Sequence, residues 1–299
     1  MKLAEKTLSA IDAMLEKDGG AKYRTFLKEA FDELQDAFSG KSETPRFHLG
    51  ASVIGKECKR ELWYSFRRCA KPKPEARVIR IFNRGHLEEA RFVAMLRAIG
   101  VNVAQYSSDG RQYGFEYWHG HFAGSCDGIA LNGIPDLPDA NVLLEFKTHN
   151  KDSFKALQKD GVEKSKPEHY VQMCVYMHYL GLQHALYMAV NKNDDALHLE
   201  IVDANSEVAE AAIKKAGEII LATEPPDAPP AYSPAFYKCK FCNNYEQCHY
   251  GEAVNRHCRT CANGSPHVSG EWYCLKHERV IEKKKQLRSC DDYEPAKQL

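Results

Sequence analysis

The sequence lacks the features that would place a chain in a membrane. No apolar run is long enough to span a bilayer, and no charged segment followed by an apolar one opens the sequence as a secretory leader would. We therefore expect a cytoplasmic protein without a membrane partner. An excess of charge of either sign is missing too, because 41 Lys and Arg residues balance 41 Asp and Glu residues. Any contact with a polyanion must come from local patches and not from an overall field.

Cysteine and apolar residues, by contrast, are plentiful. Eleven cysteines in a cytoplasmic chain stay reduced, so clustered ones predict metal ligands and not disulfides. With 299 residues and 43% apolar content, the chain can bury a full core. We expect three domains, namely a helical hairpin over 1–45, a main domain over 46–250 and a cysteine-rich module over 251–299.

Apolar periodicity predicts most of the helices. Two amphipathic helices broken at Gly19 and Gly20, with apolar positions up to Leu34, form a hairpin that packs on the main domain or clamps a partner or DNA. A helix over 50–72 is expected to begin at an N-cap Ser52. Further helices are expected over 76–100, at the start of 166–190 before a strand, and at about 205–222, with three or four strands between 101 and 150.

One segment concentrates positive charge. From Lys56 to Arg84 the sequence has ten Lys and Arg residues against three Glu residues, interleaved with aromatic side chains. Such a pattern indicates either a surface that follows a phosphate backbone or a solvated helix face.

Two acids and a lysine carry the clearest chemical signal. Asp127 lies within a segment predicted to be a strand, with small and apolar residues before the acid, and Glu145 and Lys147 end a second predicted strand. Turn-forming residues over 132–141 separate the segments, so they are expected to pair as neighbouring strands. Strand alternation then puts Glu145 and Lys147 on one face, close to Asp127. This arrangement predicts a divalent-metal site for phosphodiester hydrolysis, in which the cation stabilises charge on the attacking and leaving oxygens.

Four further motifs give residues 50–250 a resemblance to a known family. The first is a glycine with an acid in a predicted helix, Gly85 with Glu89, and the second is a glutamine and a tyrosine one turn apart, Gln172 with Tyr176. The third is a lone cysteine near a helix start, Cys58. The fourth is a closely spaced cysteine trio, Cys239, Cys242 and Cys248. With the acid pair, they resemble the RecB-like exonuclease branch of the PD-(D/E)XK nuclease superfamily. That branch includes phage exonucleases and iron–sulfur nucleases of the CRISPR-adaptation type.

The resemblance implies a fold and a set of catalytic roles. The fold would be an α/β restriction-endonuclease-like core, with a mixed central sheet flanked by helices. Magnesium or manganese would be held by two strand acids, a helix acid and a backbone carbonyl: Asp127, Glu145, Glu89 and Phe146. Lys147 would position or deprotonate the attacking water or offset phosphate charge. Gln172 and Tyr176 share one helical face and would hold the DNA backbone or orient Lys147.

The helix acid has alternatives among its neighbours. Many relatives carry His where this chain has Glu89, and both Glu88 and His86 lie close by in the sequence. We rank Glu89 first, Glu88 second and His86 third. An ordinary surface pair with Arg84 or Arg91 is the structural alternative for any of them.

The cysteines divide into two groups and three single residues. The resemblance implies that Cys58 joins Cys239, Cys242 and Cys248 around a [4Fe-4S] cluster of structural or redox role, with zinc or free thiols as alternatives. The spacing of Cys258, Cys261 and Cys274 predicts a zinc ribbon or knuckle, closed by Cys290 or alternatively by His277. Zinc would hold this small module together. The remaining cysteines have no partner by spacing and are expected to be buried: Cys69, Cys126 and Cys174.

These motifs together predict a metal-dependent deoxyribonuclease in the cytosol of a bacterium or a phage-infected host. It would degrade DNA from its ends in recombination, repair or phage DNA processing, alongside recombination or repair proteins. Two other classes stay open. One is a nuclease-fold subunit that binds and trims DNA ends within a larger complex, and the other is a zinc-dependent nucleic-acid-binding module without cleavage.

Overall fold

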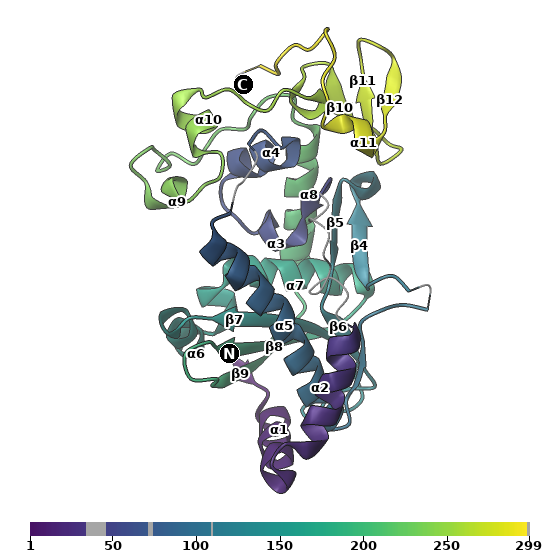
Figure 1. Ribbon diagram of the computed structural model, residues 1–299, viewed down its shortest axis with the longest axis vertical. Coiled ribbons are helices and arrows are strands. Elements are labelled where there is room, and N and C mark those ends of the chain that lie inside the picture. Colours follow the sequence, from purple (N-terminus) through teal and green to yellow (C-terminus); the bar gives the residue numbers. More distant parts are fainter. Residues whose placement is uncertain (34–45, 71–73, 109, 298–299) are drawn as a thin grey trace. The chain divides into compact units, whose positions relative to one another are not determined.

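The computed structural model describes residues 1–33, 46–70, 74–108 and 110–297, which fall into two compact units (Figure 1). The first unit takes its residues from Met1–Thr44, Pro74–Phe115 and Ser125–Ala209, and the second from Pro45–Lys73, Glu116–Gly124 and Glu210–Leu299. Both units draw on the segment 46–250, and the three expected domains stay a prediction. Within the described ranges, no helix is both long and apolar enough to cross a membrane.

A six-stranded sheet forms the centre of the first unit, in the order β1-β9-β8-β7-β6-β3. The strands are β1 (Lys2–Leu3), β3 (Asn102–Ala104), β6 (Gly128–Leu131), β7 (Val142–His149), β8 (His184–Asn191) and β9 (Leu197–Asp203). β7 and β8 are parallel, whereas the other pairs are antiparallel. A parallel pair needs a crossover, which α6 (Lys151–Ser165) and α7 (Pro167–Leu180) supply. The expected α/β fold with a mixed sheet flanked by helices is confirmed.

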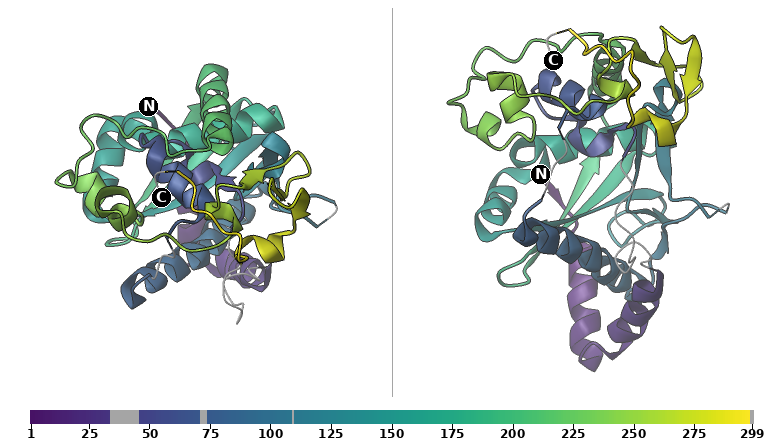
Figure 2. Two further views of the ribbon diagram at one scale, coloured as in Figure 1. Left: turned by 90° about the horizontal axis from the view of Figure 1, so that it is seen from above. Right: turned by 45° about the horizontal axis from the view of Figure 1, so that its top comes forward.

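The two faces of this sheet differ in chemistry. Leu144 and Phe146 of β7 join the apolar core with α5 (Ala76–Ala98), α1 (Glu5–Asp18) and α2 (Ala21–Glu33). Figure 2 shows α1 and α2 lying side by side as a hairpin. Because side chains alternate along a strand, Glu145 and Lys147 point to the opposite face, where α6 and α7 contact β7 and β8.

The helical hairpin follows the expected break. Gly19 ends α1 with φ 60°, in the left-handed region that glycine adopts without strain, and α2 begins two residues later. Leu34, which was expected to mark the second helix, lies outside the described residues. β1 and the Ala4 N–H, which donates to the Leu199 carbonyl at 3.0 Å, fix the start of the chain to β9.

Short elements make up the rest of the chain. Two three-stranded sheets have the orders β2-β5-β4 and β10-β11-β12. Their strands are β2 (Leu49–Gly50), β4 (Gly114–Tyr117), β5 (Phe122–Ser125), β10 (Gly264–Pro266), β11 (Trp272–Cys274) and β12 (Arg279–Ile281). The helices are α3 (Ala51–Ile54), α4 (Lys59–Arg67), α8 (Ser206–Leu221), α9 (Tyr237–Lys240), α10 (Tyr245–Tyr250) and α11 (Lys283–Gln286), with 3-10 turns η1 (Trp118–Gly120) and η2 (Cys258–Thr260).

The single helix expected over 50–72 is wrong. The chain forms α3 and α4 instead, because Gly55 ends the first helix and Cys58 is extended, with φ −80° and ψ 100°. Ser52 lies inside α3, whose N-cap is Gly50, while the Cys58 sulfur accepts a hydrogen bond from the Glu61 N–H at 3.4 Å and caps α4. Residues 71–72 of the expected helix lie outside the described ranges. The helices expected at 76–100 and 205–222 correspond to α5 and α8.

Candidate active site and cysteine centres

Asp127 lies immediately before β6, one residue outside the strand in which it was expected. Its Oδ2 accepts a hydrogen bond from the Phe146 N–H at 2.6 Å, and its carbonyl accepts one from Gln105 Nε2 at 3.3 Å. Burial raises the pKa of Asp127, although the charge of Lys147 and the hydrogen bond from the Phe146 N–H each oppose this rise. The β6–β7 pairing therefore holds this carboxylate against the backbone of the Glu145–Lys147 motif.

Glu145 is fully buried, and Lys147 follows it on the same face of β7. The Lys147 ammonium contacts Glu145 Oε1 and donates to the Phe146 carbonyl at 3.2 Å. Burial raises the pKa of Glu145 to about 7, although the charge of Lys147 opposes the shift and that of Asp127 adds to it. For Lys147, burial lowers the pKa, but the charges of Glu145 and Asp127 outweigh it and the net shift is upward. The lysine is thus a stable cation beside two acids.

The second oxygen of Glu145 gives a test of whether a metal fits. Oε2 is buried and has no hydrogen-bond partner among the described residues. Leaving a buried acceptor unpaired costs about 1–3 kcal/mol, and more for a charged group. Hard divalent cations bind carboxylate and carbonyl oxygens of this kind. The donor set of Asp127, Glu145 and the Phe146 carbonyl therefore fits magnesium or manganese.

Helix α5 brings Glu89 to the same place and turns Glu88 away. Glu89 lines a hollow of about 160 Å³ with Lys147, and its charge contributes to the raised pKa of that lysine. Glu88 is 4% exposed, pairs with Arg91 at 3.2 Å and lines a different cavity, next to α1 and α2. His86 is exposed, and a charge on it would oppose the rise in the pKa of Asp127. The geometry thus supports the first rank given to Glu89 and gives Glu88 a structural pairing.

Gln172 and Tyr176 are buried on α7. The Tyr176 hydroxyl donates to the Ser125 carbonyl at 2.7 Å, and its ring packs on Phe115 with centroids 5.4 Å apart. Burial raises the pKa of Tyr176, and the charges of Glu145 and Asp127 raise it further. The tyrosine therefore lies near the acid pair. Because both α7 side chains are less than 10% exposed, their burial favours support of the site over direct contact with a DNA backbone.

A hydrogen-bonded group that was not expected from the sequence lies next to Lys147. Tyr187 of β8 is the cross-strand neighbour of Glu145, and its hydroxyl lies 2.9 Å from His149 Nε2 and 2.8 Å from His169 Nδ1. One hydroxyl proton serves one nitrogen, so the other imidazole donates to the tyrosine oxygen. Burial and nearby lysine charges lower the pKa of His149 to about 4 and that of His169 to about 3. One feature of the sequence could have indicated this group: His169 lies three residues before Gln172, so the two share one helical face.

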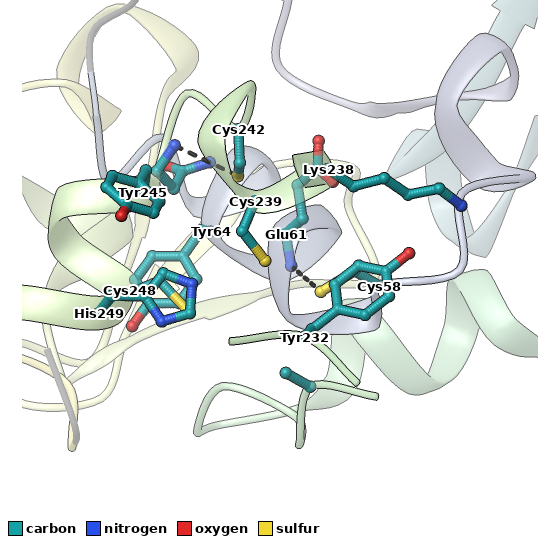
Figure 3. Close-up of a pocket in the computed structure, with 12 residues that line it drawn as sticks. Cys58, Glu61, Tyr64, Tyr232, Lys238, Cys239, Cys242, Tyr245, Cys248 and His249 are labelled. Atoms are coloured by element: carbon teal, nitrogen blue, oxygen red, sulfur yellow. Dashed lines mark hydrogen bonds between the residues drawn. The ribbon is translucent and has the colours of Figure 1, made fainter. Parts of the chain in front are cut away.

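The first cysteine group meets in one hollow of the second unit (Figure 3). Cys58 lies at the start of α4, Cys239 in α9, Cys242 just beyond it and Cys248 in α10. Burial raises the pKa of Cys239, and charge on Cys58 and Cys248 adds to the shift, so these thiols are near neighbours. The structure thus brings the distant Cys58 to the trio, and the set of four thiols fits a metal or cluster bound by four thiolates.

The second cysteine group lines another hollow of the same unit with His277. Burial raises the pKa of Cys258, and charges on Cys290, Cys261 and Cys274 add to the rise. A Cβ on Gly264 would lie 2.1 Å from the Cys258 carbonyl oxygen, so this tight turn requires glycine. Within the described ranges, the one group of three potential ligands whose ligand atoms all lie within 4.8 Å of one another is His277, Cys290 and Asp292.

The three single cysteines are buried as predicted. Cys69 and Cys174 are 1% exposed and Cys126 is 2% exposed. Burial raises the pKa of each thiol, which keeps them protonated and apolar in character.

Comparison with known proteins gives only weak likenesses. No family model and no curated protein matches the chain. The solved structure of SSO0001 is 15% identical with a TM-score of 0.40, covering 75% of this chain and 95% of that one. The alkaline exonuclease LHK-Exo from Laribacter hongkongensis is 13% identical with a TM-score of 0.40, covering 64% and 90%. LHK-Exo in complex with dAMP is 14% identical with a TM-score of 0.38, covering 57% and 85%. TM-scores this low carry no argument about function. Such an argument has to rest on the residues of the site.

Proposed function

We propose that the first unit is a magnesium- or manganese-dependent deoxyribonuclease. The observation that carries this proposal is the buried, unpartnered Oε2 of Glu145, beside Asp127 and a lysine cation. A carboxylate pair that can bind a divalent ion, with a lysine cation next to it, suits hydrolysis of a phosphodiester. Glu89 would complete the ligand set from α5.

The chain's own residues have separate tasks in this reaction. A bound divalent ion would stabilise the charge that develops on the phosphate oxygens and activate a water. Asp127, Glu145 and the Phe146 carbonyl would hold that ion. The raised pKa of Lys147 keeps its ammonium charged, which favours charge stabilisation at the phosphate over removal of a proton from water. Tyr176 would fix the Ser125 carbonyl, just before Asp127, through its 2.7 Å hydrogen bond.

A basic helix face supports DNA as the polyanionic substrate. Arg77, Arg80 and Arg84 are exposed in the first half of α5 and recur at helical spacing, from about three turns to about one turn before Glu89. Burial lowers the pKa of Lys192 most, and the charges of Arg84 and Arg77 lower it further. These three cations therefore lie close to one another. By helical spacing these arginines share the face of α5 that carries Glu88 and not the one that carries Glu89, so they would bind DNA phosphates at a distance from the hollow and not within it. We propose degradation from DNA ends, in recombination, repair or phage DNA processing.

The decisive experiment replaces Glu145 with the isosteric Gln. We expect Glu145→Gln to lower the magnesium-dependent cleavage rate by roughly 10²–10³-fold, as does loss of a group that stabilises transition-state charge. Glu200→Gln is the matched control, because Glu200 is also buried on this sheet but its carboxylate already accepts from the Val162 N–H at 3.0 Å. Full activity of the Glu145 variant on linear DNA would refute the proposal. Release of nucleotides from linear but not circular DNA would identify action from ends.

We further propose metal groups for the cysteine centres. The hollow around Cys58 and Cys239 would bind a [4Fe-4S] cluster, with zinc as the alternative, because four thiols from separated segments line it. Its position at the start of α4 would tie α9 and α10 to that helix. This role is structural or redox-linked, and it takes no part in the phosphodiester chemistry.

A further inference from the structure

A chain of hydrogen bonds joins α7 to the face of β7 that carries Glu145 and Lys147. His149 lies two residues after Lys147 and therefore on the same face of the strand. The Tyr187 hydroxyl lies 2.9 Å from His149 Nε2 and 2.8 Å from His169 Nδ1. At the other end, His149 Nδ1 lies 3.0 Å from Ser153 Oγ of α6. The chain thus runs from α6 through β7 and β8 to the first turn of α7.

Two contacts with Tyr187 fix the ring of His169. Its Nδ1 is within hydrogen-bonding distance of the hydroxyl, and its ring stacks on the phenol ring with centroids 5.8 Å apart and planes 27° apart. His169 is half-buried and shares a helical face with Gln172. Because the tyrosine engages Nδ1, any contact of this imidazole with a substrate has to use Nε2.

Cations lie near this imidazole. Burial lowers the pKa of His169 most, and the charges of Lys147, His149 and Lys166 lower it further. Lys166 is the residue just before α7, and its side chain is therefore close to the ring together with that of Lys147. Two lysine cations beside an uncharged imidazole favour an anionic ligand. In the proposed substrate, that anion is a phosphate of the DNA backbone.

We propose that His169 binds the substrate, with its Nε2–H donating to a phosphate oxygen of the DNA, and that Tyr187 and His149 are positioning residues for it. The Ser153 hydroxyl then donates to His149 Nδ1, and His149 Nε2–H donates to the Tyr187 oxygen. The Tyr187 hydroxyl in turn donates to His169 Nδ1, which leaves the proton of that imidazole on Nε2. This inference rests on the proposed nuclease function, which supplies the phosphate.

The first test compares kcat/KM on a linear DNA duplex for the full chain and its variants. A hydrogen bond to a charged group contributes roughly 10–100-fold to binding, so His169→Leu should lower kcat/KM within that range. His178→Leu is the matched control, because His178 is exposed on the same helix, and it should leave kcat/KM unchanged. His169→Gln, whose amide N–H can reach the position of Nε2, should recover part of the loss. Equal values for the two Leu variants would overturn the proposal.

A set of modified duplexes identifies the phosphate contact directly. Each duplex carries one uncharged methylphosphonate at a different linkage near one end, and binding is measured without a divalent ion, apart from cleavage. One linkage should weaken binding to the wild-type protein by about 10-fold or more and binding to His169→Leu by clearly less, because the variant has already lost this hydrogen bond. The same sensitivity of both proteins at every linkage would refute the contact.

Tyr187→Phe tests the positioning role, because it removes the hydroxyl and keeps the ring. It should lower kcat/KM less than His169→Leu, and adding it to His169→Leu should cause no further loss, since the tyrosine acts through the histidine. Fully additive losses would refute that role. Wild-type protein that neither binds nor cleaves DNA would overturn the proposed function and this inference with it. Wild-type cleavage with unchanged kcat/KM in His169→Leu would overturn this inference alone.

Discussion

The start of α1 is capped by an acid from a distant part of the chain. Ala4, the N-cap residue, supplies no side-chain bond. Asp136, from the loop between β6 and β7, accepts hydrogen bonds from the Lys6 N–H at 3.2 Å and the Thr7 N–H at 2.7 Å. The Thr7 hydroxyl, which is fully buried, donates to the same carboxylate at 2.7 Å. A single side chain therefore satisfies the first free N–H groups of the helix and ties the hairpin to the sheet.

Asp136→Ala should remove two contributions to stability at once. Loss of a helix cap costs about 1 kcal/mol, with a range of about 0.5–2. The buried Thr7 hydroxyl is left without an acceptor, which adds about 1–3 kcal/mol. The expected cost is the sum, roughly 2–4 kcal/mol. Asp136→Asn keeps an acceptor oxygen and loses mainly the charge at the helix start, so it should cost about 1 kcal/mol.

Amide hydrogen exchange over α1 measures this cost locally, which matters because the chain has two units. A loss of about 3 kcal/mol corresponds to roughly 100-fold faster exchange in α1 if local opening dominates. Asp139→Ala is the matched control, since Asp139 is an exposed acid of the same loop. A double-mutant cycle with Thr7→Val should give a coupling of about 1–2 kcal/mol. Equal exchange in the Asp136 and Asp139 variants would refute the long-range cap.

Two further predictions concern the cysteines and a buried histidine. Anaerobically purified protein should contain iron and sulfide and absorb visible light, and Cys239→Ser should lose both signals; zinc without iron in wild type would contradict the cluster. Burial first, and then nearby lysine charges, lower the pKa of His149 to about 4, so its contribution to stability is complete above pH 6.5 and is lost as the pH falls toward 4. Between pH 6.5 and 5 this loss should reach about 1.5 kcal/mol in urea unfolding, and should disappear in His149→Gln but not in the exposed control His178→Gln.

Local patterns sufficed for much of the fold. The periodicity of α5 and α8 and the turn-rich segment between β6 and β7 depend on neighbours in the sequence, and each was expected within a few residues. The approach of Glu145 to Asp127 followed from that one hairpin, because pairing two adjacent strands leaves little choice of register. Cys58, by contrast, was assigned to the trio of Cys239, Cys242 and Cys248 only because of the family resemblance.

Contacts between distant segments could not be predicted in this way. The Asp136 cap joins residues 129 positions apart, and an acid before Leu-Pro has no local mark of that role. Tyr187 and His149 meet because β8 pairs with β7 in parallel, a register that α6 and α7 set. The break between α3 and α4 could not be seen from periodicity, because apolar residues recur in both helices and only Gly55 between them marks the end of the first.

A row of buried polar side chains crosses the central sheet of the first unit and includes the unpartnered Oε2 of Glu145. Glu145, Tyr187 and Glu200 are cross-strand neighbours on β7, β8 and β9, and each brings polar atoms into the interior. Glu200 accepts from the Val162 N–H and lies 3.0 Å from His198 Nε2, while Tyr187 bonds both its histidines. Of the described carboxylates in this row, only Glu145 has a buried oxygen without a hydrogen-bond partner, and this oxygen lies beside Asp127. A sheet that satisfies its other buried groups gains most from a cation at that point, so a divalent ion should stabilise the first unit by binding the folded state alone.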